Sequence, residues 1–280
     1  MSNLLIHSMS EFSEIIVDAL DLAGVKEIVE IGAEFGGMSS VLADFAAAHR
    51  GRLTSVDPCP KDEFIAWAAE HPDVHHIAKT SFDAFDELEQ VDAWVIDGDH
   101  NWYTVYNELK RVDGICRRDG KPLLAFLHDV AWPWARRDLY YAPDRIPEAF
   151  RHAYSYEGGV TLDYPGVIQD RGFRGHGQYA CAIHEGGPCN GVLTAVEDFV
   201  DELRGAGRGI AFARVPAVFG LGILFSTDAD WAPALSELVI PYHENQLIQR
   251  LEENRLRNYL KVIDWQDRDA ERREHRRNAA

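Results

Sequence analysis

The sequence predicts an α/β protein built on one doubly wound sheet of seven strands, mostly parallel with an antiparallel terminal strand. Three observations support this fold class. Short β-branched runs alternate with stretches of helical spacing over the first 130 residues, the first run ends in a glycine-rich loop, and two more apolar runs follow near residue 220. Strands that alternate with helices are typical of crossover units, which form parallel sheets covered on both faces.

Each element follows from its own pattern. Apolar or β-branched runs predict strands at 26–32, 52–57, 74–79, 92–97, 121–129, 210–215 and 220–225. Helical spacing, often closed by a glycine, predicts helices at 11–24, 37–51, 62–71, 82–88, 102–115 and 191–205. The last two strands form a closing pair, and we expect the main domain to span residues 1–226.

Two segments depart from this alternation. Residues 130–190 are rich in glycine, proline, tyrosine and arginine, which indicates an inserted lid that supplies the acceptor site. Residues 227–280 predict a C-terminal helical arm, whose charged final stretch, 267–280, is expected to fray into solvent. The apolar stripe of this arm fits a homo-oligomer contact and packing on its own domain equally well.

Composition limits the function classes. The 280 residues carry a formal net charge of −18, which argues against a nucleic-acid partner. The four cysteines form no CxxC pair, so we expect a reducing, cytoplasmic protein without a zinc knuckle. The first residues lack the pattern of a secretory signal, and no apolar run is long enough to predict a membrane span.

The glycine-rich loop, VEIGAEFGGMSS, lies between the first strand and the next helix. Gly32 suits a sharp turn, and the free amides of the helix start favour a polar or anionic ligand. Asp57 ends the second strand, where a carboxylate can accept hydrogen bonds from both ribose hydroxyls. Glu34 takes the place of the second glycine of the dinucleotide GxGxxG pattern, so nucleoside binding is favoured and a dehydrogenase is a weaker alternative.

On these residues the chain resembles the class I S-adenosylmethionine-dependent methyltransferases, whose domains are Rossmann-like. The resemblance rests on EIGAEFGG, on the acid in SVDP and on VIDGDH, and it covers roughly residues 10–226. It extends to a bacterial group with IDGDH after strand four and HD after strand five, often tied to sugar or natural-product modification. The resemblance implies S-adenosylmethionine as the cofactor, with the glycine loop around its methionine part, Asp57 on its ribose, and Ser81 and Phe82 near its adenine. The implied cofactor-binding residues are Glu30, Gly32, Glu34, Phe35, Ser39, Asp57, Ser81, Phe82, Asp97 and Asp99.

Acids and histidines gather at two neighbouring strand ends. Asp97 closes the fourth strand, and His128 and Asp129 close the fifth. Ligands bind at the carboxyl edge of such sheets, so these three residues are expected at the reacting centre. They suit a divalent ion such as Mg²⁺ or Mn²⁺, although histidine is a poor Mg²⁺ ligand, and they also suit proton transfer without a metal. In that case His100 or His128 is the expected base.

The insert supplies candidates for acceptor binding. They are Trp132, Arg136, Arg137, Tyr140 and Tyr141. Such a set can hold a sugar or aromatic ring, or bind a carboxylate or phosphate through arginine. The alternative is that the aromatic side chains pack the lid onto the domain while the arginines pair with Asp138 and Asp144.

These patterns predict methyl transfer from S-adenosylmethionine to a hydroxyl of a sugar-containing or natural-product acceptor, either a small molecule or a glycan. An N- or carboxyl-methyltransferase keeps the same fold and is the alternative enzyme. An alternative of another class is a non-catalytic nucleoside-binding or assembly module that uses the C-terminal helix as an interaction arm. Acids and a histidine at adjacent strand ends speak against that alternative, because a scaffold has no use for them.

Overall fold

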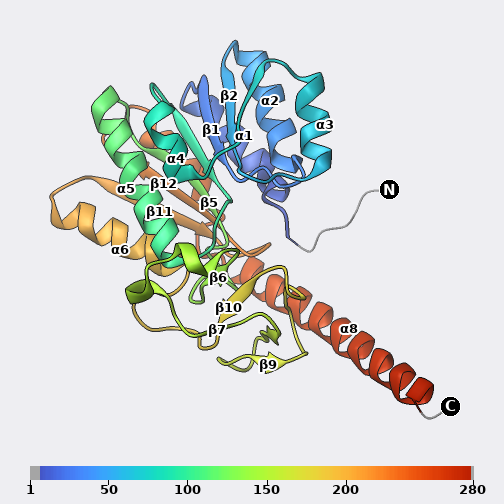
Figure 1. Cartoon of the computed structure of the whole chain (residues 1–280). Helices are drawn as coiled ribbons and strands as arrows, with labels where there is room; N and C mark the ends of the chain where they lie inside the picture. The colour runs from blue at the N-terminus through green and yellow to red at the C-terminus, as the bar shows by residue number, and fades with distance from the viewer. Residues whose placement is uncertain (1–6, 279–280) are drawn as a thin grey trace.

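The computed structural model describes residues 7–278 and shows a twisted sheet with helices on both faces (Figure 1). The sheet has seven strands in the order β3-β2-β1-β4-β5-β12-β11. These strands are β1 (Glu27–Ile31), β2 (Arg52–Val56), β3 (Val74–Ile77), β4 (Ala93–Ile96), β5 (Leu124–His128), β11 (Ile210–Val215) and β12 (Leu221–Ser226). Every strand predicted from the sequence is present, and the predicted fold class is confirmed.

The pairing of the strands determines where a ligand can bind. Strand β1 pairs in parallel with both β2 and β4, and the chain order reverses between them. In open α/β sheets this switch point leaves a crevice at the carboxyl ends of the two strands. Strand β12 is antiparallel to β5 and to β11, so the antiparallel strand is last in the sequence but lies one position inside the sheet edge.

The helices cover the two faces in separate groups. They are α1 (Ser13–Leu22), α2 (Gly37–His49), α3 (Asp62–Glu70), α4 (Ser81–Ala84), α5 (Trp102–Asp119), α6 (Val192–Gly205), α7 (Ala232–Val239) and α8 (Gln246–Asn278), with short 3-10 helices η1 (Met9–Phe12), η2 (Phe85–Glu87), η3 (Pro143–Arg145) and η4 (Glu148–Phe150). Strand β4 shows the division: Trp94 and Ile96 join the core under α5 and α6, whereas Val95 joins the core under α1, α2 and α7. Both faces are covered, which explains why the central strands β4 and β5 are buried at every position rather than at alternate ones.

The insert between β5 and α6 forms small sheets of its own, drawn in green to yellow in Figure 1. Its strands are β6 (Leu139–Tyr140), β7 (Tyr154–Ser155), β8 (Gly158–Gly159), β9 (Ile168–Gln169) and β10 (Ala180–Ala182). The buried carboxylate of Asp138 fastens it to the domain, because one oxygen accepts the backbone N–H groups of Trp102 and Gly191, each at 2.7 Å. The other oxygen accepts the hydroxyl of Tyr140 at 2.7 Å.

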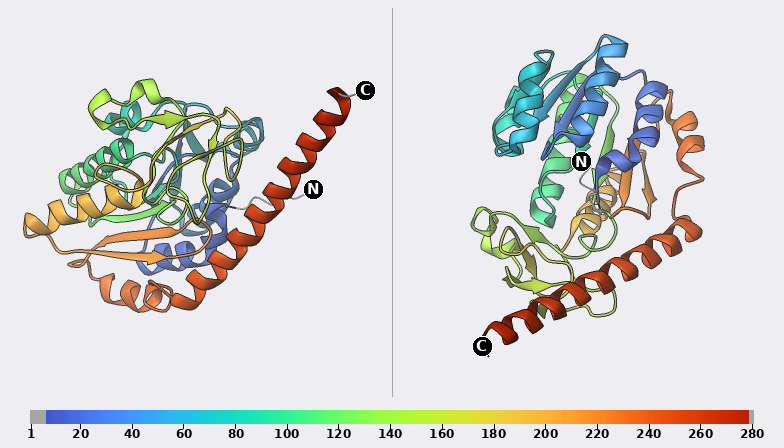
Figure 2. Two further views of the ribbon diagram at one scale, coloured as in Figure 1. Left: turned by 90° about the horizontal axis from the view of Figure 1, so that it is seen from below. Right: turned by 90° about the vertical axis from the view of Figure 1, so that its right-hand side faces the viewer.

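The long helix α8 runs beside the insert and extends beyond the body of the molecule (Figures 1 and 2). Two arginines of the insert contact its charged end: Arg174 Nη2 lies 2.7 Å from Asp267 Oδ1, and Arg171 Nη2 lies 2.6 Å from Glu271 Oε1. The expected fraying of 267–280 is therefore wrong for the described residues, since the helix continues to Asn278. Two of its acids, Asp267 and Glu271, therefore have partners on the insert.

The structure shows no break in the core near residue 226. Leu235 and Val239 of α7 are buried in the same core cluster as Ile16 of α1, so α7 packs as part of the domain. Helix α8 also reaches the core, because its Leu256 is buried in the cluster under α5 and α6. Leu251 and Trp265 on α8 stay exposed, and a homo-oligomer contact there remains a prediction. Within residues 7–278, no helix has both the length and the apolarity needed to cross a membrane.

Candidate active site

The glycine loop after β1 is shaped by close packing against the end of β4. Gly32 has a φ of +91°, and a Cβ built on it would lie 2.3 Å from the carbonyl oxygen of Asp97. Only glycine fits this position, because any side chain would collide with the neighbouring backbone. Gly36, with a φ of +82°, then forms the N-cap of α2. The loop amides and Asp97 are thus brought to one place.

Asp57, directly after β2, accepts hydrogen bonds from the backbone of the glycine loop. Its Oδ2 accepts the N–H groups of Ala33 at 2.9 Å and Glu34 at 3.2 Å, and its Oδ1 accepts that of Cys59 at 2.8 Å. A carboxylate offers about four acceptor positions, so roughly one is left for a ligand. Asp57 lines the cavity, and its predicted contact with the cofactor ribose stays a prediction. The sequence did not indicate that Asp57 also organises the loop.

Glu30 forms a buried polar group beneath the same loop. The hydroxyls of Ser39 and Ser55 both donate to its Oε2 at 2.6 Å. Burial raises the pKa of Glu30 to about 7, although the two hydroxyls favour its charged form. Glu30 lines the cavity. Ser39 is buried behind it, so this predicted cofactor residue acts through Glu30.

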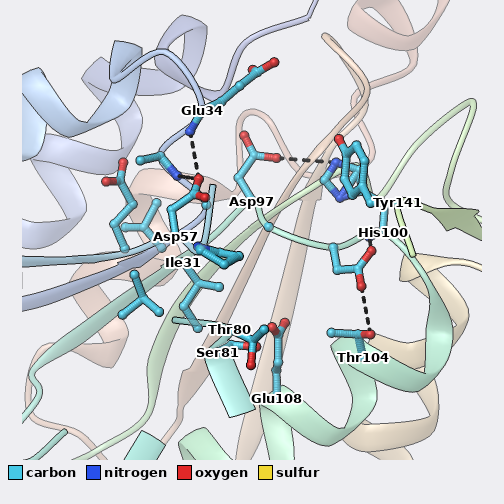
Figure 3. A pocket seen from close by; sticks show the side chains of 18 of the residues that line it. Ile31, Glu34, Asp57, Thr80, Ser81, Asp97, His100, Thr104, Glu108 and Tyr141 are labelled. Atoms are coloured by element: carbon cyan, nitrogen blue, oxygen red, sulfur yellow. Dashed lines mark hydrogen bonds and ion pairs between the residues drawn. The ribbon is translucent and has the colours of Figure 1, made fainter. Parts of the chain in front are cut away.

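These groups open onto one cavity of about 1280 Å³. Pockets for small ligands usually measure about 300–1,000 Å³, so this one has room for a nucleoside cofactor and an acceptor together. Of the predicted site residues, its lining includes Glu30, Gly32, Glu34, Phe35, Asp57, Ser81, Phe82, Asp97, Asp99, His100, Asp129 and Tyr141. Figure 3 shows Glu34 and Ser81 well apart in this cavity, with Asp57 between them in the view.

The ends of β4 and β5 bring together the acids and histidines expected at the reacting centre. His100 Nε2 lies 3.0 Å from Asp129 Oδ2 and 3.9 Å from Asp97 Oδ1. His128 Nδ1 lies 3.2 Å from Asp97 Oδ1 and 3.5 Å from Asp129 Oδ2. Each histidine therefore faces both carboxylates.

His128 is the histidine of this cluster whose surroundings favour the protonated form. It is buried, and its Nε2 donates to the carbonyl oxygen of Val218 at 2.9 Å, which leaves Nδ1 facing the carboxylates. Burial alone would lower the pKa of His128, but Asp97 and Asp129 outweigh it and raise the pKa to about 9. An imidazolium with both nitrogens donating has no lone pair for a proton or a metal. This geometry argues against His128 as the base and as a metal ligand.

The groups that converge as metal ligands are instead Asp97, His100 and Asp129, whose ligand atoms all lie within 4.8 Å of one another. Asp129 is 1 % exposed and has a φ of +63°, a left-handed conformation that turns its side chain toward His100. Its Oδ1 is buried with no hydrogen-bond partner among the described residues. The donor set of two carboxylates and one imidazole fits a divalent ion.

A second group of acids lies on α5 and just before it. Asp99 Oδ2 accepts the hydroxyl of Thr104 at 3.1 Å, and burial raises the pKa of Asp99. Glu108, one turn after Thr104, is 1 % exposed and also lines the cavity, beside Ser81. Sequence reasoning missed Glu108, because a glutamate on a helix ordinarily faces solvent.

Of the aromatic residues predicted to bind the methyl acceptor, one lines the cavity and two do not. Tyr141 lines the cavity, and its ring meets that of His100 edge to face, with 6.0 Å between the centroids. Tyr140 is fully buried on the opposite side of the strand, and Trp132 packs on Phe173 and Phe219. Neither Tyr140 nor Trp132 is among the cavity-lining residues, so the alternative of lid packing fits both.

The two predicted arginines also lie outside the cavity lining. Arg136 forms a two-pronged ion pair with Glu197 of α6, with N–O distances of 2.5 and 2.7 Å. Arg137 is 1 % exposed and donates to the carbonyl oxygens of Ala182 at 2.5 Å and Pro165 at 2.6 Å. Both hold the insert together, although their partners are not the acids that sequence reasoning considered.

Other lining residues also went unpredicted, and three of them are His7, Lys61 and Arg145. His7 stacks on Phe219 with 4.8 Å between ring centroids, and burial lowers its pKa. None of the three belongs to a motif or follows a strand, so the sequence carries no local signal for them.

The segment that carries this site is similar to known proteins. Residues 29–130, which contain the glycine loop, Asp57 and the ends of β4 and β5, match the model of a family described as a methyltransferase domain. Among solved structures, the methyltransferase PaMTH1 of Podospora anserina, bound to SAH, is 15% identical, with 80% of this chain and 81% of that one covered and a TM-score of 0.47. The O-methyltransferase TomG of Streptomyces achromogenes, involved in tomaymycin synthesis and bound to SAM, is 14% identical, with 78% and 80% covered and a TM-score of 0.44. No curated protein matches the chain.

The matched segment contains the glycine loop, Asp57, Asp97 and Asp129, at the carboxyl ends of strands in the seven-stranded sheet. Residues 29–130 of the chain are therefore identified as a methyltransferase domain.

Proposed function

We propose that the protein methylates a hydroxyl group of a small-molecule or glycan acceptor, and that His100 removes the hydroxyl proton. The observation that carries this proposal is the contact of His100 Nε2 with Asp129 Oδ2 at 3.0 Å, at the wall of the cavity. The other histidine of the cluster, His128, is fully engaged by its hydrogen bonds.

The tautomer of His100 follows from its partner. A neutral imidazole that donates through Nε2 to a carboxylate keeps its lone pair on Nδ1, which is then the nitrogen that accepts a proton. Asp129 orients the ring and stabilises the imidazolium that forms, as a carboxylate does beside a general base. Asp97, 3.9 Å from the same nitrogen, adds to this stabilisation.

The cofactor would supply, when bound, a sulfonium methyl group for transfer to the acceptor oxygen, with S-adenosylhomocysteine as the leaving group. The glycine loop above Glu30 suits its charged methionine part, and the remaining acceptor position of Asp57 suits its ribose. With the cofactor in this orientation, Ser81 and Phe82 line the part of the cavity that would hold its adenine ring. On the other side of Asp97, Tyr141 and Arg145 of the insert line the space left for the acceptor.

A divalent cation is the second candidate for activating the acceptor. Asp97, His100 and Asp129 would hold it, and it would supply a lower pKa for the acceptor hydroxyl. The unpartnered Oδ1 of Asp129 favours this candidate. The cationic His128, within 3.5 Å of both carboxylates, weighs against it, because it already neutralises part of their charge.

Labelled S-adenosylmethionine with a panel of phenols, catechols and glycosides, and with the matching amines, tests the proposal. His100→Ala is expected to lower kcat by about 10²- to 10⁴-fold, the usual contribution of a general base, while the affinity for S-adenosylhomocysteine changes little. His75→Ala, at an exposed position on β3, is the matched control. Methylation of amines alone would contradict the proposal.

The same assay separates the two ways of activating the hydroxyl. Protein treated with EDTA is expected to keep its activity if His100 acts as the base. Loss of activity in EDTA, restored by Mg²⁺ or Mn²⁺ and absent in Asp129→Asn, would establish the cation instead.

A further inference from the structure

Glu108 is a buried carboxyl group that the reacting cluster does not use. It lies on α5, is 1 % exposed, and lines the cavity at the end where Ser81 begins α4. Ser81 hydrogen-bonds to the carboxyl group, but Glu108 Oε2 has no partner among the described residues. Buried polar atoms nearly always have a partner, so an exception on a cavity wall indicates a group that a ligand completes.

The charges around Glu108 keep it neutral. Asp99, on the loop before α5, faces it, and Ser81 on α4 is its hydrogen-bonding neighbour. The two cations that follow it on α5 are engaged elsewhere, since Lys110 pairs with Glu202 and Arg111 with Asp86. Burial raises the pKa of Glu108 to about 8, with Asp99 adding to the effect and Ser81 opposing it. The carboxyl group is therefore mostly protonated near neutral pH, and it can donate a hydrogen bond.

We propose that Glu108 binds the adenine ring of the cofactor, donating from its protonated Oε2 to a ring nitrogen. This inference rests on the cofactor placement proposed above. Adenine ring nitrogens are acceptors without hydrogens, so they complement an O–H donor and would repel a carboxylate. Figure 3 shows Glu108 beside Ser81, far from Asp97 and His100. The contact therefore serves to recognise the adenine ring and takes no part in methyl transfer.

Calorimetric titration with S-adenosylhomocysteine and its 1-, 3- and 7-deaza analogues tests the contact, because each analogue replaces one ring nitrogen by C–H. Wild-type protein is expected to bind one analogue about 10- to 100-fold more weakly than the parent, the range for losing a buried hydrogen bond. Glu108→Leu is expected to bind the parent correspondingly more weakly and to lose the penalty for that analogue. A role in folding alone would weaken all four ligands equally.

A second variant uses the protonation of the group. Glu108→Gln keeps a neutral donor, so it is expected to bind S-adenosylhomocysteine at neutral pH within a few-fold of wild type. Above pH 8, wild-type affinity is expected to fall relative to Glu108→Gln, approaching tenfold per pH unit, because Glu108 ionises. Comparing the two proteins cancels the titration of the ligand and of Asp99. Affinity that rises with pH in wild type would show that a carboxylate binds the amino group instead, and would overturn the proposal.

Controls distinguish the possible failures. Asp113→Asn changes another buried acid of α5 that pairs with Arg117 and Arg208 rather than facing the cavity, and it is expected to leave affinity unchanged. If wild-type protein bound no S-adenosylhomocysteine, the cofactor placement itself would fail. If wild type and Glu108→Leu bound it equally, only the role of Glu108 would be overturned.

Discussion

The packing of Gly32 against Asp97 makes a quantitative prediction for Gly32→Ala. The new Cβ would lie 2.3 Å from the carbonyl oxygen of Asp97, more than 1 Å inside the 3.4 Å at which ordinary contact begins. The ends of β1 and β4 would have to separate, which we expect to cost about 1–3 kcal/mol of local strain. The positive φ adds about 1–2 kcal/mol for any residue with a side chain. The expected total is about 2–5 kcal/mol of unfolding free energy.

The chain offers a matched control in Gly24, which has a φ of +64° and no atom within 4 Å of a built Cβ. Gly24→Ala carries the backbone cost without the collision, so we expect it to lose only about 1–2 kcal/mol. Urea unfolding of both variants measures the difference, and titration with S-adenosylhomocysteine measures the accompanying loss of cofactor affinity in Gly32→Ala. Equal destabilisation by the two substitutions would refute the steric reasoning.

Three further predictions concern buried charges. The pKa of His128 rises from 6.5 in the unfolded chain to about 9 in the folded protein, so the stabilisation it provides is complete below pH 6.5 and is lost as the pH rises through 9. The difference in unfolding free energy between wild type and His128→Gln should therefore change by about 3 kcal/mol across that pH range. A difference that stays constant with pH would contradict this prediction. Asp138→Ala leaves two buried N–H groups unpaired and should lower stability by about 2–5 kcal/mol, whereas Asp138→Asn, which keeps an acceptor oxygen, should retain most of it in thermal unfolding. Arg174→Ala removes the paired contacts to Asp267 and should speed hydrogen exchange near the end of α8 with little change in Tm; unchanged exchange there would show that other contacts hold the helix.

The sheet could be predicted from the sequence because its information is local. Runs such as 92–97 are apolar on both faces, end in polar residues and alternate with helical spacing, so each strand is visible by itself. The same logic predicted that Asp97 and Asp129 lie close together, since the carboxyl ends of adjacent parallel strands must meet.

The remaining features depend on contacts between distant segments. His128 is held by the carbonyl of Val218, ninety residues later, and Arg137 is a core residue because carbonyls of Ala182 and Pro165, from distant parts of the insert, surround it. Glu108 gave no signal because its burial depends on the cavity and not on its helix. The end of α8 looked solvent-exposed by composition, yet the partners of its acids lie in the insert.

The position of β12 has a consequence for the order in which the protein is made. Strand β5 acquires its second neighbour only when residues 221–226 have been synthesised, and the turn before them carries the Val218 carbonyl that fixes His128. The glycine loop and Asp57 need nothing beyond β4. Domains tend to fold from the N-terminus during synthesis. We therefore expect the emerging chain to complete its nucleoside-facing half well before its reacting half, and a fragment ending before residue 218 to hold the first without the second.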